Sequence, residues 1–157
     1  MAQEPNVAQQ RLGALLERVA IPVAVAESLT GGELSARLAA VPGAGAWFRG
    51  GVVAYASDVK HDVLDVPPGP VVSEATATAM ARGVCRLLSA KVAIAVTGVG
   101  GPDPADGEAP GTVWLALSDE GTAAARLEHF HGSPAEIVDA TCACAVDWLV
   151  EHFEERG

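Results

Sequence analysis

The sequence of 157 residues is poor in aromatic side chains, which make up 4% of it, and it contains no long apolar run. Because no stretch approaches the roughly 20 apolar residues that a membrane span needs, we expect no membrane insertion. Residues 1–5 lack the basic start and apolar stretch of a signal peptide, so we expect a cytoplasmic protein. Ala, Val and Leu must fill the core, which favours thin layers of helix against sheet.

Basic residues are scarce as well. Ten Lys and Arg stand against twenty Asp and Glu, which gives a formal net charge of −10. Such an acidic surface repels a polyanion and the basic residues are scattered, so we expect no direct binding of nucleic acid. A small anionic ligand stays compatible with this charge, because one Arg or a helix N-terminus can hold a phosphate locally.

Cysteine is limited to Cys85, Cys142 and Cys144, an odd number that argues against a disulfide framework in a cytoplasmic chain. Cys142 and Cys144 are two apart in a predicted helix, so their side chains diverge and chelate poorly. His129 and His131 alternate on one face of a predicted strand, but the sequence offers no third ligand beside them. We therefore expect no metal site.

The length suits a single domain over residues 1–157 with one core. Periodicity and breakers predict helices over 7–19, 31–40, 58–64, 73–89 and 134–153, and strands over 23–26, 51–55, 92–96, 112–117 and 123–130. The early strand–helix–strand order implies parallel pairing, whereas the turn at 118–121 is too short for a crossover and predicts an antiparallel hairpin. We predict a three-layer α/β/α sandwich on a mixed five-stranded sheet, mostly parallel with a late antiparallel hairpin.

Three polar segments lie at the carboxyl ends of the strands that we predict to be parallel. They are Glu27-Ser28, Tyr55 and Thr97-Gly98. Ligands of such sheets sit outside the carboxyl ends of the strands, so these segments should converge on one site.

Ser28 lies where the first strand turns into a helix, which resembles a nucleophile elbow although no G-x-S-x-G is present. Gly31 and Gly32 would let a ligand approach the backbone, and the N–H groups of the first helical turn could stabilise an oxyanion. The alternative from this segment alone is that Ser28 or Thr30 caps the helix.

Lysine is rarer than arginine, with only Lys60 and Lys91 against eight arginines. A desolvated lysine can lose its proton and act as a base, which arginine cannot, so Lys60 is a candidate base. Tyr55, the only tyrosine, precedes Lys60 by five residues, and its hydroxyl could orient the amine. The alternative is an ordinary surface lysine beside a half-buried tyrosine.

The segment 97–102, Thr-Gly-Val-Gly-Gly-Pro, follows the third strand. Its consecutive backbone amides could form an anion-binding nest, but no G-K-[ST] follows and it is not a P-loop. Asp103, Asp106 and Glu108 suggest either a cation site or, more simply, a solvated loop.

Several of these motifs together resemble the CinA C-terminal family, which includes stand-alone nicotinamide mononucleotide deamidases. The resemblance covers about residues 7–150 in the same order. The matching segments are 26–32, 41–44, 48–55, 60–64, 72–74, 95–98 with 101–102, and 111–114.

The resemblance implies an amidohydrolase that converts nicotinamide mononucleotide to nicotinate mononucleotide and ammonia, without a metal or organic cofactor. It implies Ser28 as nucleophile, Lys60 as general base and Tyr55 as supporting hydroxyl. The positions it implies for substrate binding are Thr30, Gly31, Gly32, Thr97, Gly98 and Thr112. Two family arginines are missing near 132–139, and Arg49 is the candidate to replace part of their contact with a substrate phosphate.

Two other functions stay open. The missing arginines suggest an amidase for a different, less anionic amide. A non-catalytic nucleotide-binding or regulatory module would bind its ligand without turnover. Ala-rich helices are also compatible with a homodimer.

Overall fold

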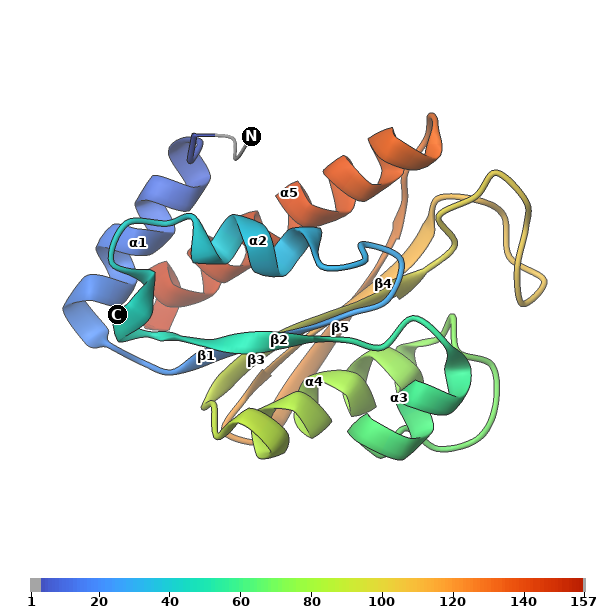
Figure 1. Cartoon of the computed structure of the whole chain (residues 1–157), viewed down its shortest axis with the longest axis horizontal. Coiled ribbons are helices and arrows are strands. Elements are labelled where there is room, and N and C mark those ends of the chain that lie inside the picture. The colour runs from blue at the N-terminus through green and yellow to red at the C-terminus, as the bar shows by residue number, and fades with distance from the viewer. Residues whose placement is uncertain (1–3, 157) are drawn as a thin grey trace.

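The computed structural model describes residues 4–156 and builds them around one five-stranded sheet (Figure 1). The strands are β1 Val23–Glu27, β2 Phe48–Val53, β3 Val92–Gly98, β4 Thr112–Asp119 and β5 Thr122–His129. They lie in the order β2-β1-β3-β4-β5, with β1 parallel to β2 and β3, and with β3–β4 and β4–β5 antiparallel. The predicted mixed sheet with a late hairpin is confirmed.

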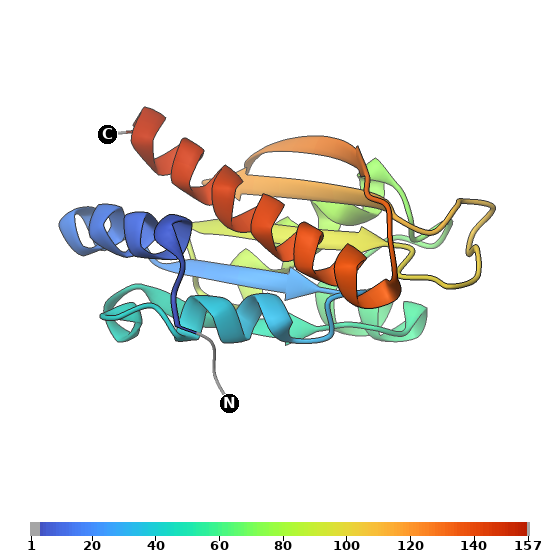
Figure 2. The same ribbon diagram turned by 90° about the horizontal axis from the view of Figure 1, so that it is seen from above.

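Helices cover both faces of the sheet. On one face lie α1 Val7–Val19, α2 Glu33–Ala39 and α5 Pro134–Arg156, and on the other lie α3 Ser57–Leu64 and α4 Glu74–Leu88 (Figures 1 and 2). The three-layer prediction is therefore confirmed. No helix within residues 4–156 is both long enough and apolar enough to cross a bilayer.

Alternation along the central strands explains why the two helical layers differ. Because successive strand residues point to opposite faces, β1 and β3 send valine and isoleucine toward α1 and α5 and alanine toward α4. The alanines are Ala24, Ala26, Ala93 and Ala95. With such small side chains on the sheet, α4 can lie close to it, as the low aromatic content predicted.

Helix α3 is held against α4 by an unusually close backbone contact. Gly83 of α4 faces Leu64, and a Cβ atom at position 83 would collide with the Leu64 carbonyl oxygen. Leu64 ends α3, and Lys60 lies one turn before it. Glycine at 83 therefore fixes how α3 sits on the domain.

The second strand differs from its prediction over 51–55. It begins at Phe48 because residues 48–53 pair along β1, and it ends at Val53. A Cβ at Gly51 would collide with the side chain of Ser35, so the glycine admits α2 against the strand. Helix α4 is capped by Ser73, whose side-chain oxygen accepts the N–H of Thr76 at 3.1 Å.

Candidate functional site

A cavity of about 320 Å³ lies outside the carboxyl ends of β1 and β3. Its walls come from the turn after β1, from the segments on either side of α3, and from the loop that links β3 to β4. Five of the residues singled out from the sequence line it together, namely Ser28, Tyr55, Lys60, Thr97 and Gly98. The fold therefore brings the predicted segments together at this edge of the sheet, as expected.

Ser28 follows directly after β1 and is 7% exposed. Its hydroxyl makes no hydrogen bond with any residue between 4 and 156. Within the same range, no side-chain nitrogen or oxygen that is fully shielded from solvent lacks a partner. The Ser28 hydroxyl must therefore reach the open space of the cavity, where a ligand can contact it.

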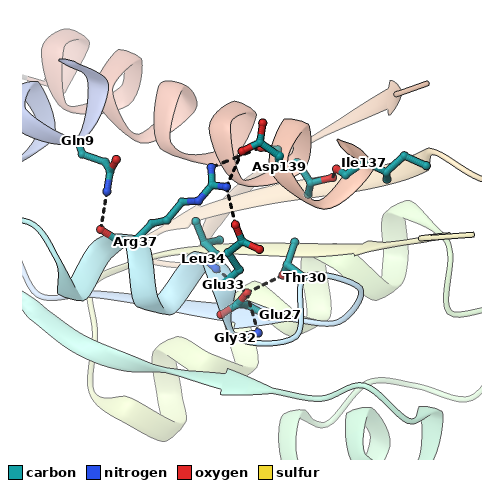
Figure 3. A network of polar contacts seen from close by, with 10 residues as sticks. Gln9, Glu27, Thr30, Gly32, Glu33, Leu34, Arg37, Ile137 and Asp139 are labelled. Carbon is teal, nitrogen blue, oxygen red and sulfur yellow. Dashed lines mark hydrogen bonds and ion pairs between the residues drawn. The ribbon is translucent and has the colours of Figure 1, made fainter. Parts of the chain in front are cut away.

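The carboxylate of Glu27, the residue before Ser28, caps α2. Its side chain is fully buried and accepts five hydrogen bonds. Figure 3 shows Glu27 beside Thr30 and Gly32. One oxygen accepts from the Thr30 hydroxyl at 2.6 Å, Leu34 N at 2.9 Å and Gly32 N at 3.2 Å. The other accepts from Ser35 N at 2.8 Å and the Ser35 hydroxyl at 2.6 Å. A negative charge at a helix N-terminus is favourable, and charge-assisted hydrogen bonds are strong.

This network corrects two expectations. Neither Ser28 nor Thr30 caps the helix, because the carboxylate of Glu27 outcompetes a hydroxyl for the N–H groups; the Thr30 hydroxyl itself donates to Glu27. The first-turn N–H groups cannot stabilise an oxyanion either, since those of Leu34 and Ser35 already donate to Glu27. The sequence held a signal for this, because Glu27 is the one charged residue at the end of an otherwise apolar buried strand.

Replacing Glu27 by Ala should lower the free energy of unfolding by about 3 kcal/mol, because it leaves several buried donors without an acceptor. Urea denaturation followed by circular dichroism measures the change. The matched control is Glu33→Ala on the same helix, which removes only the partly exposed ion pair with Arg37 (Figure 3) and should cost less than about 1 kcal/mol. Equal losses in the two variants would contradict the assignment of the cap.

Lys60 is the most deeply buried charged group in the cavity wall, with 2% of its surface exposed. Its amine Nζ donates to the main-chain carbonyl oxygen of Tyr55 at 2.9 Å. Burial lowers the pKa of Lys60 below its ordinary value, and the carboxylate of Asp106 offsets part of that effect. A Ser–Lys pair requires an amine with a lowered pKa and a free hydroxyl, and the two residues that supply these groups line the same cavity.

Tyr55 supports Lys60 through its backbone. The side chain is 72% exposed, and the atom that contacts the amine is the carbonyl oxygen. The orienting role that the sequence assigned to the phenol hydroxyl is thus filled, in this structure, by the main chain. A role for the hydroxyl itself stays a prediction.

The loop from β3 to β4 is tied to the other wall of the cavity. The Thr97 hydroxyl donates to the Val71 carbonyl oxygen at 2.8 Å. The Asp106 carboxylate accepts from Val71 N at 3.0 Å and Val72 N at 3.2 Å. The two contacts hold residues 71–72 and the loop together over the site.

Asp106 is therefore a site residue that sequence reasoning placed in a solvated loop. It sits at the tip of a two-residue hairpin in which Ala105 and Glu108 exchange backbone hydrogen bonds of 2.8 and 3.1 Å. Asp106 and Gly107 have φ angles of 52° and 75°, as a type I′ turn requires. The Asp-Gly dipeptide was the available signal, since it is typical of such turns.

Part of the predicted anion-binding nest is unavailable to a ligand, because one of its N–H groups already donates to the backbone. The N–H of Val99 donates to the Thr112 carbonyl oxygen at 2.9 Å. By contrast, the N–H groups of Leu29, Gly100 and Gly101 donate to no other residue in the described range, and all three residues line the cavity. These amides are the candidate oxyanion donors in place of those of α2.

Five other predicted residues do not line the cavity, namely Thr30, Gly31, Gly32, Arg49 and Thr112. Arg49 stands at the beginning of β2, at the opposite end of the strand, where its Nε donates to the Leu88 carbonyl oxygen at 2.9 Å. Gly31 and Gly32 have φ angles of 58° and 108°, and they let the chain turn around Glu27. Thr112 begins β4 just beyond the cavity. None of these residues lines the cavity, although the N–H of Gly31 donates to the Ser28 carbonyl oxygen at 3.1 Å.

A larger hollow of about 620 Å³ lies between the β4–β5 hairpin and α5. Four charged or titratable residues in its lining, Asp119, Arg126, His152 and Arg156, already have partners. Asp119 accepts from His152 at 2.7 Å and from Arg156 at 2.8 Å, and Arg126 pairs with Glu151 at 3.0 Å. Within residues 4–156 no three His, Cys, Asp or Glu side chains gather in a way that could hold a metal ion. The smaller cavity, with its free hydroxyl, is the better candidate site.

Known proteins share the whole fold. A family model described as the CinA C-terminal domain matches residues 6–153. CinA-like proteins of Geobacter sp. (strain M21) and Geobacter metallireducens are 37% and 40% identical over 99% and 86% of this chain. The chain spans only 39% and 34% of the length of these two relatives.

Solved structures match over nearly their full length. A CinA superfamily protein of Klebsiella pneumoniae superimposes with a TM-score of 0.92 at 31% identity, covering 98% of this chain and 99% of that one. The competence/damage inducible protein CihA of Agrobacterium tumefaciens gives a TM-score of 0.88 at 28% identity, covering 96% and 98%.

Proposed function

Because the chain belongs to the CinA C-terminal domain family, we propose that it is an amidohydrolase that deamidates nicotinamide mononucleotide to nicotinate mononucleotide and ammonia. The observation that carries the proposal is the pairing of two groups in one cavity. The Ser28 hydroxyl has no partner there, and the Lys60 amine is buried in the wall of the same space.

The reaction runs through an acyl-enzyme. The Ser28 oxygen attacks the carboxamide carbon while the neutral Lys60 amine accepts the hydroxyl proton, and the amine then passes that proton to the departing ammonia. A water molecule attacks the resulting ester, with Lys60 again taking the proton and returning it to the Ser28 oxygen. The N–H groups of Leu29 and Gly100 stabilise the oxyanion. The Ser28–Lys60 contact forms with substrate, since such contacts often tighten only in the complex.

The direct test is ammonia release by the purified protein from nicotinamide mononucleotide, with the acid product identified by mass spectrometry. We expect one ammonia for each nicotinate mononucleotide formed. A protein that binds the nucleotide but releases no ammonia, even at high enzyme concentration, would instead be a binding or regulatory module.

The pH profile tests Lys60 as the base. Only the neutral amine can accept a proton, so kcat/KM should rise with pH as Lys60 deprotonates. Because burial lowers its pKa, the rise should be centred below the ordinary lysine value of 10.5. Asp106→Asn removes the carboxylate that raises this pKa, so it should move the rise to lower pH. A flat profile, or a shift to higher pH in the variant, would contradict the assignment.

A further inference from the structure

Strand β5 forms an open edge of the sheet. It pairs only with β4 and lies at the end of the sheet opposite β2 (Figure 2). It runs for 8 residues without proline, and its register with β4 has no bulge. Proteins usually shorten, bulge or cover such an edge, because its free N–H and C=O groups can pair with another chain. β2, the other edge strand, is shorter, contains two glycines and shifts its register against β1. β5 is therefore the edge that offers a regular row of pairing groups.

Every second residue of β5 directs its backbone groups away from β4. Asp119 and Thr122 flank a two-residue turn, 120–121, with φ angles of 51° and 90°, so they form the closing hydrogen-bonded pair of a type I′ hairpin. Bonded and non-bonded pairs then alternate, which agrees with the bond of 2.8 Å from the Phe130 N–H to the Gly111 carbonyl oxygen. Four residues of β5 face outward and have no backbone hydrogen-bond partner within residues 4–156, namely Ala123, Ala125, Leu127 and His129.

The charges of β5 are complementary to a second β5 in one antiparallel register. If Leu127 stands opposite its own counterpart, Arg126 of each copy stands opposite Glu128 of the other, which is a favourable cross-strand pair. Centring the pair on Arg126 or on Glu128 would instead place like charges opposite each other. Arg126 is held in place for this contact, because its guanidinium lies 4.1 Å from the centre of the Trp148 ring and 3.0 Å from the Glu151 carboxylate. The side chain of Leu127 is 42% exposed and would be covered by the same residue of the second copy.

We propose that a second copy of this chain binds along β5, in an antiparallel two-fold arrangement centred on Leu127 that joins the two sheets into one. A two-fold interface requires a strand that is complementary to itself, and β5 meets this requirement in the register of its charges. The outward N–H and C=O groups of residues 125–129 supply the affinity, and the two pairs of Arg126 with Glu128 fix the register. Strand pairing alone is a small interface, so we expect a dissociation constant of about 10 µM. The proposal does not depend on the amidohydrolase function.

Analytical ultracentrifugation over about 1–300 µM measures the dimer, and we expect the parent chain to pass from monomer to dimer within this range. Leu127→Lys places two like charges opposite each other at the two-fold axis, so it should weaken dimerisation about tenfold or more. The matched control is Leu87→Lys, which makes the same change at a leucine of α4 that is 51% exposed. It should dimerise within about twofold of the parent, as surface substitutions outside an interface usually do. Circular dichroism shows whether each variant is folded.

A charge exchange tests the register. Arg126→Glu alone and Glu128→Arg alone each place like charges opposite each other, so each should dimerise about fivefold more weakly than the parent. An equimolar mixture of the two variants restores both pairs of opposite charge and should dimerise as tightly as the parent. A parent chain that stays monomeric at about 300 µM would overturn the proposal. So would a folded Leu127→Lys protein that dimerises like the parent, or a mixture that associates no more tightly than its components.

Discussion

Replacing Ser28 by Ala should lower kcat/KM for ammonia release by about 10⁴-fold, because it removes the oxygen that forms the acyl-enzyme. The hydroxyl makes no hydrogen bond within the described chain, so its loss leaves no donor or acceptor unsatisfied. Stability should therefore change by less than about 1 kcal/mol. The test is a steady-state ammonia assay beside a thermal melt of the same preparation.

The matched control is Ser57→Ala. Ser57 also lines the cavity, but it is exposed at the start of α3 and has no assigned role in the reaction. Its variant should turn over within about threefold of the parent, as surface substitutions usually do. A Ser28→Ala protein that retained a tenth of the parent activity would exclude Ser28 as nucleophile.

Replacing Lys60 by Arg should reduce turnover by about 10³-fold, although it preserves the positive charge. Arginine does not release its proton in proteins, so it cannot take the proton of Ser28. The larger guanidinium must also fit where only 2% of the lysine is exposed, which can disturb folding. Lys60→Met covers that case, because it fills the site without a charge and should stay folded yet inactive.

Lys91→Arg is the control for this substitution. Lys91 is the only other lysine, and its side chain is largely exposed in a 3.8 Å ion pair with Glu120. Its replacement should leave turnover unchanged. If folded Lys60→Met kept the parent rate at every pH, a base other than Lys60 would have to be found.

Much of the fold follows from local patterns. Helix α1 occupies the predicted residues 7–19, and the short turn before β5 predicted the hairpin correctly. Periodicity and turn chemistry act over a few residues, so the sequence displays them directly. The extent of β2 depends instead on pairing with β1 and on the fit of Gly51 against Ser35. Those partners are distant in the sequence or specific to one side chain, so local patterns do not reveal them.

For the candidate site, too, the sequence predicted some features and not others. Ser28 and Lys60 were identified because few residue types can serve as nucleophile and removable proton acceptor. The roles of Glu27 as the cap of α2 and of Asp106 as the acceptor for residues 71 and 72 were missed, because the folded chain supplies the partners. Arg49 was a candidate only as a replacement for the missing family arginines, and it lies near the start of β2, at the end of the strand away from the cavity.

The close contact between Gly83 and Leu64 links the proposed base, Lys60, to a position outside the cavity. Helix α3 cannot move away from α4 without displacing the Lys60 amine, since Lys60 lies one turn before the contact. Displacements of about 1 Å in a reacting group can cost about a hundredfold in rate. A side chain at position 83 should therefore reduce both the stability of the fold and the proposed activity. We expect homologues that keep this activity to keep glycine at that position.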